Sequence, residues 1–130
     1  MKMKNVIENL STLIAIDEKM REKGFVWSNP QQIIQQMHAE ADEIKEAIEK
    51  NESQERINEE IGDLIHAVIS LISYTESDLE EILDYHNYKI SCRFTALERI
   101  AKERGYTTLH GLPSETLTDL WIAAKKESPV

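Results

Sequence analysis

Two pairs of acidic residues in this sequence share one spacing. Glu40 and Glu43 are three residues apart, and so are Glu60 and Asp63. Side chains at positions i and i+3 of a helix lie on the same face, so each pair projects to one side. If the two helices pack together, four carboxylates share one cleft, and their mutual repulsion favours binding of a cation. Ligands that are all oxygen favour Mg²⁺, with Mn²⁺ as the alternative.

The elements that carry these pairs are expected to be helices. Only 4 Gly and 3 Pro interrupt the 130 residues, and apolar residues recur every three or four positions almost throughout. We therefore expect one all-α domain over residues 1–130, an antiparallel bundle of about five helices. Capping residues place them at about 5–22, 30–50, 54–74, 78–104 and 114–126, with Ser114 as the cap of the last.

The short turn at residues 51–53 makes the second and third helices antiparallel neighbours. Periodicity centres their apolar stripes on six residues: Met37, Ile44 and Ile48, then Ile61, Val68 and Ile72. Glu40 and Glu60 are then expected on the shoulders of these stripes. Ala47 and Ala67 share those shoulders, and their small side chains allow the helices to approach closely.

The sequence around the two pairs resembles a known family. Residues 39–44 read AEADEI and residues 59–64 read EEIGDL, which is similar to the E-E-x-x-E-L and E-E-x-G-D motifs of the all-α MazG-type nucleoside triphosphate pyrophosphohydrolases. The likeness extends to GFVWS at 24–28, NYKISCRF at 87–94 and the segment from Leu117 to Lys125. It covers nearly the whole chain.

This resemblance implies hydrolysis of a nucleoside triphosphate to the monophosphate and pyrophosphate, in nucleotide-pool control or house-cleaning. It implies that Mg²⁺ is held by all four acidic residues, Glu40, Glu43, Glu60 and Asp63. Lys89 and Arg93 would face the phosphates and stabilise charge on pyrophosphate, with Asn87 nearby. Trp121 and Lys125 would contact the nucleotide.

Two further roles concern single residues near these motifs. Glu43 is our choice for activating the attacking water, because it lies farther from the helix seam than Glu40 and reaches outward. Trp27 either stacks on a base or closes the end of the bundle.

Departures from the family motifs keep other interpretations open. Ala39 replaces a glutamate, and Ser28 replaces the aspartate that follows the tryptophan. These changes motivate a catalytically impaired helical interaction or scaffold protein that binds through its acidic face. A carboxylate-bridged di-iron protein is a third interpretation, since Asp63 and His66 imitate one half of a paired E-x-x-H arrangement. His38 cannot supply the other half.

Composition and charge exclude several classes of partner. The chain has 15 Lys and Arg against 24 Asp and Glu, a net charge of −9, which opposes binding to nucleic acid. Its longest uncharged run, residues 64–75, is too short to span a bilayer, which takes about 20 apolar residues. The single cysteine, Cys92, fits a reducing cytoplasm.

The third helix is apolar over more than half of its turns between Ile61 and Ile72. One antiparallel neighbour cannot cover so wide a surface. We therefore expect a homodimer in which two protomers complete a four-helix-bundle core, with the nucleoside triphosphate as the small-molecule partner.

Overall fold

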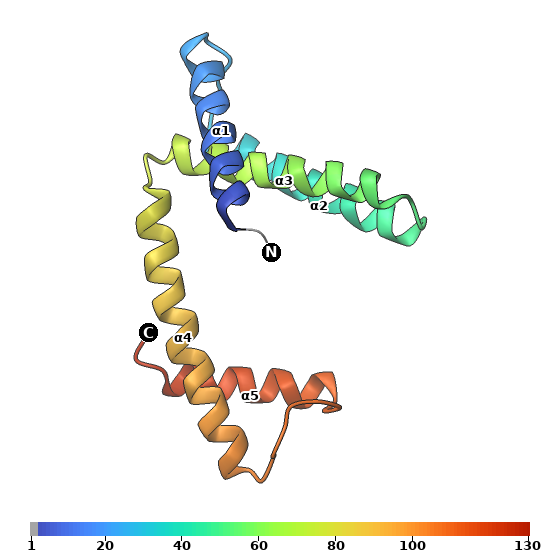
Figure 1. Cartoon of the computed structure of the whole chain (residues 1–130), viewed down its shortest axis with the longest axis vertical. Coiled ribbons are helices and arrows are strands. Elements are labelled where there is room, and N and C mark those ends of the chain that lie inside the picture. Colours follow the sequence, from blue (N-terminus) through green and yellow to red (C-terminus); the bar gives the residue numbers. More distant parts are fainter. Residues whose placement is uncertain (1–2) are drawn as a thin grey trace. The chain divides into compact units, whose positions relative to one another are not determined.

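The computed structural model describes residues 3–130, which form five α-helices and no strand. Figure 1 shows α1 (Met3–Glu22), α2 (Pro30–Glu49), α3 (Gln54–Tyr74), α4 (Leu79–Glu103) and α5 (Ser114–Glu127). The predicted all-α class and the five helices are therefore confirmed. In the described part of the chain, every helix is too short or too polar to cross a membrane.

The chain divides into two compact units, which are described separately below. The first runs to Asp78 and contains α1, α2 and α3, and the second runs from Leu79 to Val130 and contains α4 and α5. That residues 1–130 act as one domain stays a prediction.

Local sequence signals account for most helix ends. Gly24 ends α1 with a φ of +92°, in the left-handed region that glycine adopts at low cost. The Asn29 side chain accepts a 2.9 Å hydrogen bond from the Gln32 amide at the start of α2, and Pro30 occupies the first helical position. The predicted cap at Ser114 is wrong, because Ser114 is itself the first residue of α5 and Pro113 precedes it.

Helices α2 and α3 run antiparallel and side by side (Figure 1). The expected position of their contact is wrong in part. Among the predicted apolar centres, Ile48 is 55% exposed and Ile61 and Val68 are also exposed, whereas Met37, Ile44 and Ile72 are half-buried. The buried residues of the two helices are Ile33, Glu40, Ala47, Glu60, Ala67, Ile69 and Ser70.

The two alanines explain this shift of the seam. Ala47 and Ala67 are 2% and 5% exposed, so the helices meet where their side chains are shortest, as expected for a close approach. Hydropathy alone would rotate the seam toward the isoleucines. As a result, Glu40 and Glu60 lie within the packed seam.

In the second unit, α4 and α5 enclose a small apolar core. Its buried residues are Ala96, Leu97, Ile100, Ala101, Leu120 and Ala124. Trp121 and Tyr106 are half-buried and pack against this core. The second unit is thus held together by conventional apolar burial.

Candidate metal centre and adjoining cavity

Three of the four predicted metal ligands meet in the first unit. Glu40, Glu60 and Asp63 each offer a carboxylate oxygen, and these oxygens lie within 4.8 Å of one another. Glu40 and Glu60 are only 7% and 2% exposed, whereas Asp63 is exposed. The group therefore combines two buried carboxylates with one that solvent reaches.

Each buried glutamate is held by a residue one turn earlier on its own helix. Gln36 Nε2 donates to Glu40 Oε1 at 2.5 Å, and Arg56 Nη2 lies 2.5 Å from Glu60 Oε1. The other oxygen of each carboxylate, Oε2, is buried without a hydrogen-bond partner among the residues that the structure describes. Burying unpaired carboxylate oxygens is costly.

Glu43 joins this group from the solvent side. It is exposed, and its carboxyl adjoins those of Glu60 and Glu40. A proton shared with these neighbours, together with their negative charges, raises the pKa of Glu43 to about 7. Glu43 thus lies beside the group of three carboxylates, whereas its part in holding a metal stays a prediction.

The donor set fits a hard divalent cation. It consists of carboxylate oxygens only, and two of them are buried and unpaired on the protein side. Mg²⁺ and Mn²⁺ prefer oxygen ligands, and Mg²⁺ is commonly held by a few carboxylates with water and substrate phosphates completing its coordination. A cation would supply the charge compensation that these oxygens lack.

Gln36 and Arg56 were missed from the sequence. Both stand four residues before the glutamate that they hold, a spacing that places side chains in contact on a helix. Arg56 also pairs with Glu59 at 2.8 Å and with Glu52 at 3.8 Å. It therefore anchors several carboxylates and not Glu60 alone.

A cavity of about 290 Å³ adjoins the carboxylates in the first unit. Glu40 and Asp63 line one part of it, and Trp27 with Phe25 and Met20 forms apolar wall. The remaining lining residues are Asp17, Arg21, Gln36, His66, Ala67 and Ser70. Trp27 is half-buried and shares this cavity with two of the predicted metal ligands.

A polar network at the cavity ties α1 to α3. Asp17 Oδ1 accepts from Ser70 Oγ at 2.9 Å and lies 3.1 Å from His66 Nε2, while Asp17 Oδ2 accepts from Arg21 Nε at 3.2 Å. Burial by itself would raise the pKa of Asp17, but the bonds to Ser70, Arg21 and His66 outweigh burial and lower it. The one sequence signal for this network was an aspartate in register with the apolar face of the first helix.

The structure gives His66 a partner other than a metal. Its Nε2 faces Asp17, and the acidic group of Glu40, Glu60 and Asp63 includes no histidine from the described residues. The arrangement thus lacks the E-x-x-H pairing that motivated the di-iron interpretation.

The remaining candidate residues belong to the second unit. On α4, Asn87 is exposed, whereas Lys89 and Arg93 are half-buried, and Arg93 Nε donates to the Val130 carbonyl at 3.3 Å. On α5, Trp121 packs against the apolar core and Lys125 is exposed. Their approach to the carboxylates stays a prediction.

Comparison with known proteins gives one family. The family described as the MazG nucleotide pyrophosphohydrolase domain matches residues 28–97, more than half of the chain and a stretch that includes all four acidic residues. The chain is 30% identical over 120 residues to the nucleoside triphosphate pyrophosphohydrolase/pyrophosphatase MazG of Thermotoga maritima, covering 92% of this chain and 45% of that protein.

A second relative gives the same result. The nucleoside triphosphate pyrophosphohydrolase of Escherichia coli K12 is 29% identical over 113 residues, which cover 86% of this chain and 43% of that protein. The chain thus spans somewhat less than half the length of the curated relatives that it matches. The extent of the family match, together with its coverage of the acidic motifs, shows that the chain belongs to the MazG nucleotide pyrophosphohydrolase domain family.

Proposed function

We propose that this protein hydrolyses nucleoside triphosphates to the monophosphate and pyrophosphate with Mg²⁺ as cofactor, Mn²⁺ being able to replace it. The observation that carries the proposal is the meeting of carboxylate oxygens of Glu40, Glu60 and Asp63 within 4.8 Å of one another, with Glu43 beside the first two. The unpaired buried oxygens of Glu40 and Glu60 support a cation at this point. The names of both relatives support the reaction.

In this proposal the four carboxylates hold the cation, which neutralises charge on the phosphate oxygens and lowers the pKa of a water molecule when bound. Glu43 takes a proton from the attacking water as the new bond to the α-phosphorus forms. The bond from that phosphorus to the α–β bridging oxygen breaks, and pyrophosphate leaves with the electron pair.

Residues of α4 and α5 are the proposed contacts to the substrate. Lys89 and Arg93 are one helical turn apart on α4, a spacing that lets both face one phosphate chain. They stabilise charge on the departing pyrophosphate, with Asn87 beside them. Trp121 and Lys125 contact the nucleotide, and Trp27 stacks on the base within the cavity of the first unit.

We further propose that the protein is a homodimer that works in the cytoplasm on the nucleotide pool. Exposed apolar side chains on α2 and α3 support a second copy as their partner: Ile34, Ile48, Ile61, Ile65 and Val68. Pairing these helices between two protomers would complete a four-helix core. Light scattering at micromolar concentration tests this assembly, and a monomeric mass would contradict it.

The activity is tested with the purified 130-residue chain and each common ribo- and deoxyribonucleoside triphosphate. We expect monophosphate and pyrophosphate in the presence of Mg²⁺, and no products with excess EDTA. Release of diphosphate and inorganic phosphate would show that the wrong bond is cleaved. No hydrolysis of any nucleotide together with no Mg²⁺ binding would favour the interaction-protein alternative.

A further inference from the structure

The polar side of the cavity in the first unit has no role in the reaction as proposed. This side is lined by Asp17, Arg21, His66 and Ser70, which share the cavity with Glu40. The residues predicted to bind phosphate do not line it. The cavity therefore joins the candidate metal centre to a hydrogen-bonding surface and to the aromatic side chain of Trp27.

Asp17 holds neighbouring side chains in place. It is 4% exposed, and both of its oxygens are occupied by donors from Arg21, His66 and Ser70. It is not part of the group whose oxygens lie within 4.8 Å. Its contacts fix one nitrogen of Arg21 and one nitrogen of His66.

The side chains of both residues also reach the cavity. The side chains of Arg21 and His66 are 38% and 33% exposed, and both line the cavity. His66 has a second ring nitrogen, Nδ1, that can form a further hydrogen bond. The two Nη groups of Arg21 are donors, so the surface offers several hydrogen-bonding groups.

The charge of this network favours a neutral polar ligand over a phosphate. Arg21 carries one positive charge and Asp17 carries one negative charge at 3.2 Å, so the pair is close to neutral. Glu40 and Asp63, in the same cavity, repel a phosphate that lacks a cation. The phosphates therefore belong at the carboxylates, and the hydrogen-bonding surface is left for the remainder of the molecule.

We propose that Arg21 and His66 contact the nucleoside part of the substrate and that Asp17 is the positioning residue that holds both of them. This inference rests on the proposed function for the identity of the substrate. The apolar wall of Trp27, Phe25 and Met20 suits the faces of a base, and Arg21 with His66 suits polar atoms of the base or sugar. These two residues would then determine nucleotide preference.

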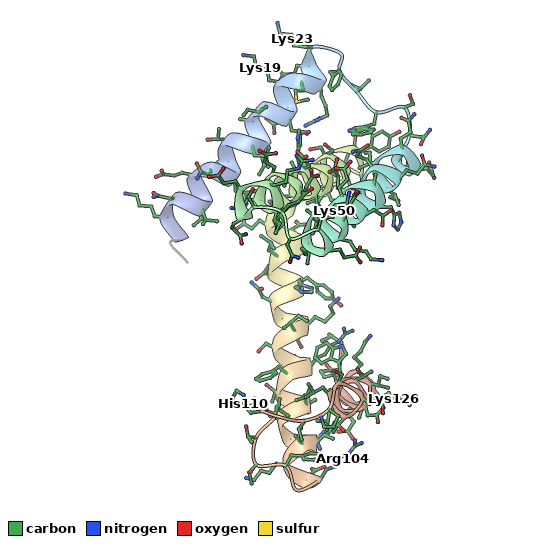
Figure 2. The ribbon with its side chains drawn as sticks, turned by 90° about the vertical axis from the view of Figure 1, so that its right-hand side faces the viewer. Lys19, Lys23, Lys50, Arg104, His110 and Lys126 are labelled. Atoms are coloured by element: carbon green, nitrogen blue, oxygen red, sulfur yellow. The ribbon has the colours of Figure 1, made fainter. Side chains whose placement is uncertain are left out.

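Product inhibition separates the two ends of the substrate. Nucleoside monophosphates of the four common bases report on the nucleoside end, and inorganic pyrophosphate reports on the end that lacks a nucleoside. The test variant is Arg21→Met. Its matched control is Lys19→Met, which removes the same charge from an exposed position two residues earlier on α1 (Figure 2).

We expect Arg21→Met to weaken inhibition by the monophosphate that the wild type prefers about tenfold, which is the loss expected for one hydrogen bond to a charged group. Inhibition by pyrophosphate and the value of kcat should stay within about twofold, and Lys19→Met should match the wild type. Equal weakening of monophosphate and pyrophosphate inhibition would overturn the proposal, because Arg21 would then contact phosphate.

A second variant tests the role of Asp17. Asp17→Asn keeps the shape and removes the charge that holds Arg21, so the KM for the triphosphate should rise severalfold with kcat nearly unchanged. If Asp17 only ties α1 to α3, the melting temperature falls while KM and monophosphate inhibition do not change, and the proposal is wrong.

Failure of the proposed function and failure of this inference give different results. If the wild type hydrolyses no triphosphate, that function fails, but calorimetric titration with monophosphates in Mg²⁺ still tests the surface. Binding that Arg21→Met weakens and Lys19→Met does not would support the inference. No monophosphate binding to the wild type would overturn it.

Discussion

The seam between α2 and α3 and the seam between α4 and α5 both contain buried alanines, but they differ in the other residues that they bury. Both bring helices close through alanines: Ala47 and Ala67 in the first, Ala96, Ala101 and Ala124 in the second. Both also bury larger apolar residues, namely Ile33 and Ile69 in the first and Leu97, Ile100 and Leu120 in the second. The first buries Glu40 and Glu60 in addition.

This difference indicates where the molecule gives up stability for chemistry. Apolar burial in the second unit stabilises it directly. In the first unit, two carboxylates are desolvated with one oxygen of each unpaired among the described residues, a cost that a bound cation offsets. Substitutions in the two seams should therefore differ in kind as well as in size.

The largest effect is expected at the carboxylates. Glu60→Ala or Asp63→Ala should lower Mg²⁺-dependent pyrophosphate release by at least about a hundredfold, because losing a ligand should cost no less than losing a residue that orients one. Helical circular dichroism should remain. Glu55→Ala, at an exposed acidic position on the same helix, is the matched control and should retain activity. Turnover retained by Glu60→Ala would reject the site.

The opposite result is expected in the second seam. Leu120 is fully buried, so Leu120→Ala should lower the free energy of unfolding by about 2–5 kcal/mol. Urea denaturation measures this, with Leu117→Ala at a partly exposed position as control. The divalent-ion affinity of the folded Leu120→Ala protein should be unchanged. If this affinity falls as much as in Glu60→Ala, the two seams do not differ in kind.

A smaller effect is expected from the arginine that holds Glu60. Arg56→Met should lower Mg²⁺ affinity about tenfold, because Glu60 loses the contact that orients it. Lys45→Met, an exposed position on α2, is the control for lost positive charge, and calorimetry gives both affinities. Higher affinity in Arg56→Met would show instead that Arg56 competes with the cation.

The smallest effect is a pH dependence confined to the first seam. The pKa of Glu43 is raised from 4.5 to about 7. Between these values, the folded protein binds a proton that the unfolded chain has released. Raising the pH through this range should therefore lower the stability of the metal-free protein.

Melting temperatures of the EDTA-treated protein measure this dependence. The decline with pH should be weaker in Glu43→Gln, which cannot titrate, and adding Mg²⁺ should reverse it in the wild type. The same slope in Glu43→Gln and in the wild type would assign the dependence to another group.

The helices and the approach of the acidic residues to one another could be predicted from the sequence, because caps, glycines and i, i+3 spacing are local signals. Gly24 at the end of α1 and Asn29 at the start of α2 are such signals. The rotation of α2 and α3 was not predictable from hydropathy, since close packing at Ala47 and Ala67 outweighs burial of the isoleucines. Only the three-dimensional pairing decides between these two effects.

The hydrogen-bond network around Asp17 was also not predictable from the sequence. Asp17 is separated from His66 by 49 residues and from Ser70 by 53, so no helical spacing relates them. By contrast, Gln36 with Glu40 and Arg56 with Glu60 are local pairs that attention to i, i+4 spacing would have revealed.

The most direct test of the shared carboxylate site is a calorimetric titration of EDTA-treated protein with Mn²⁺, followed by competition with Mg²⁺. We expect saturable binding in the wild type and in Leu117→Ala, strong weakening in Glu40→Ala and Glu60→Ala, and displacement of Mn²⁺ by Mg²⁺. An absence of saturable binding, or binding that both glutamate variants retain, would contradict a metal centre in this seam.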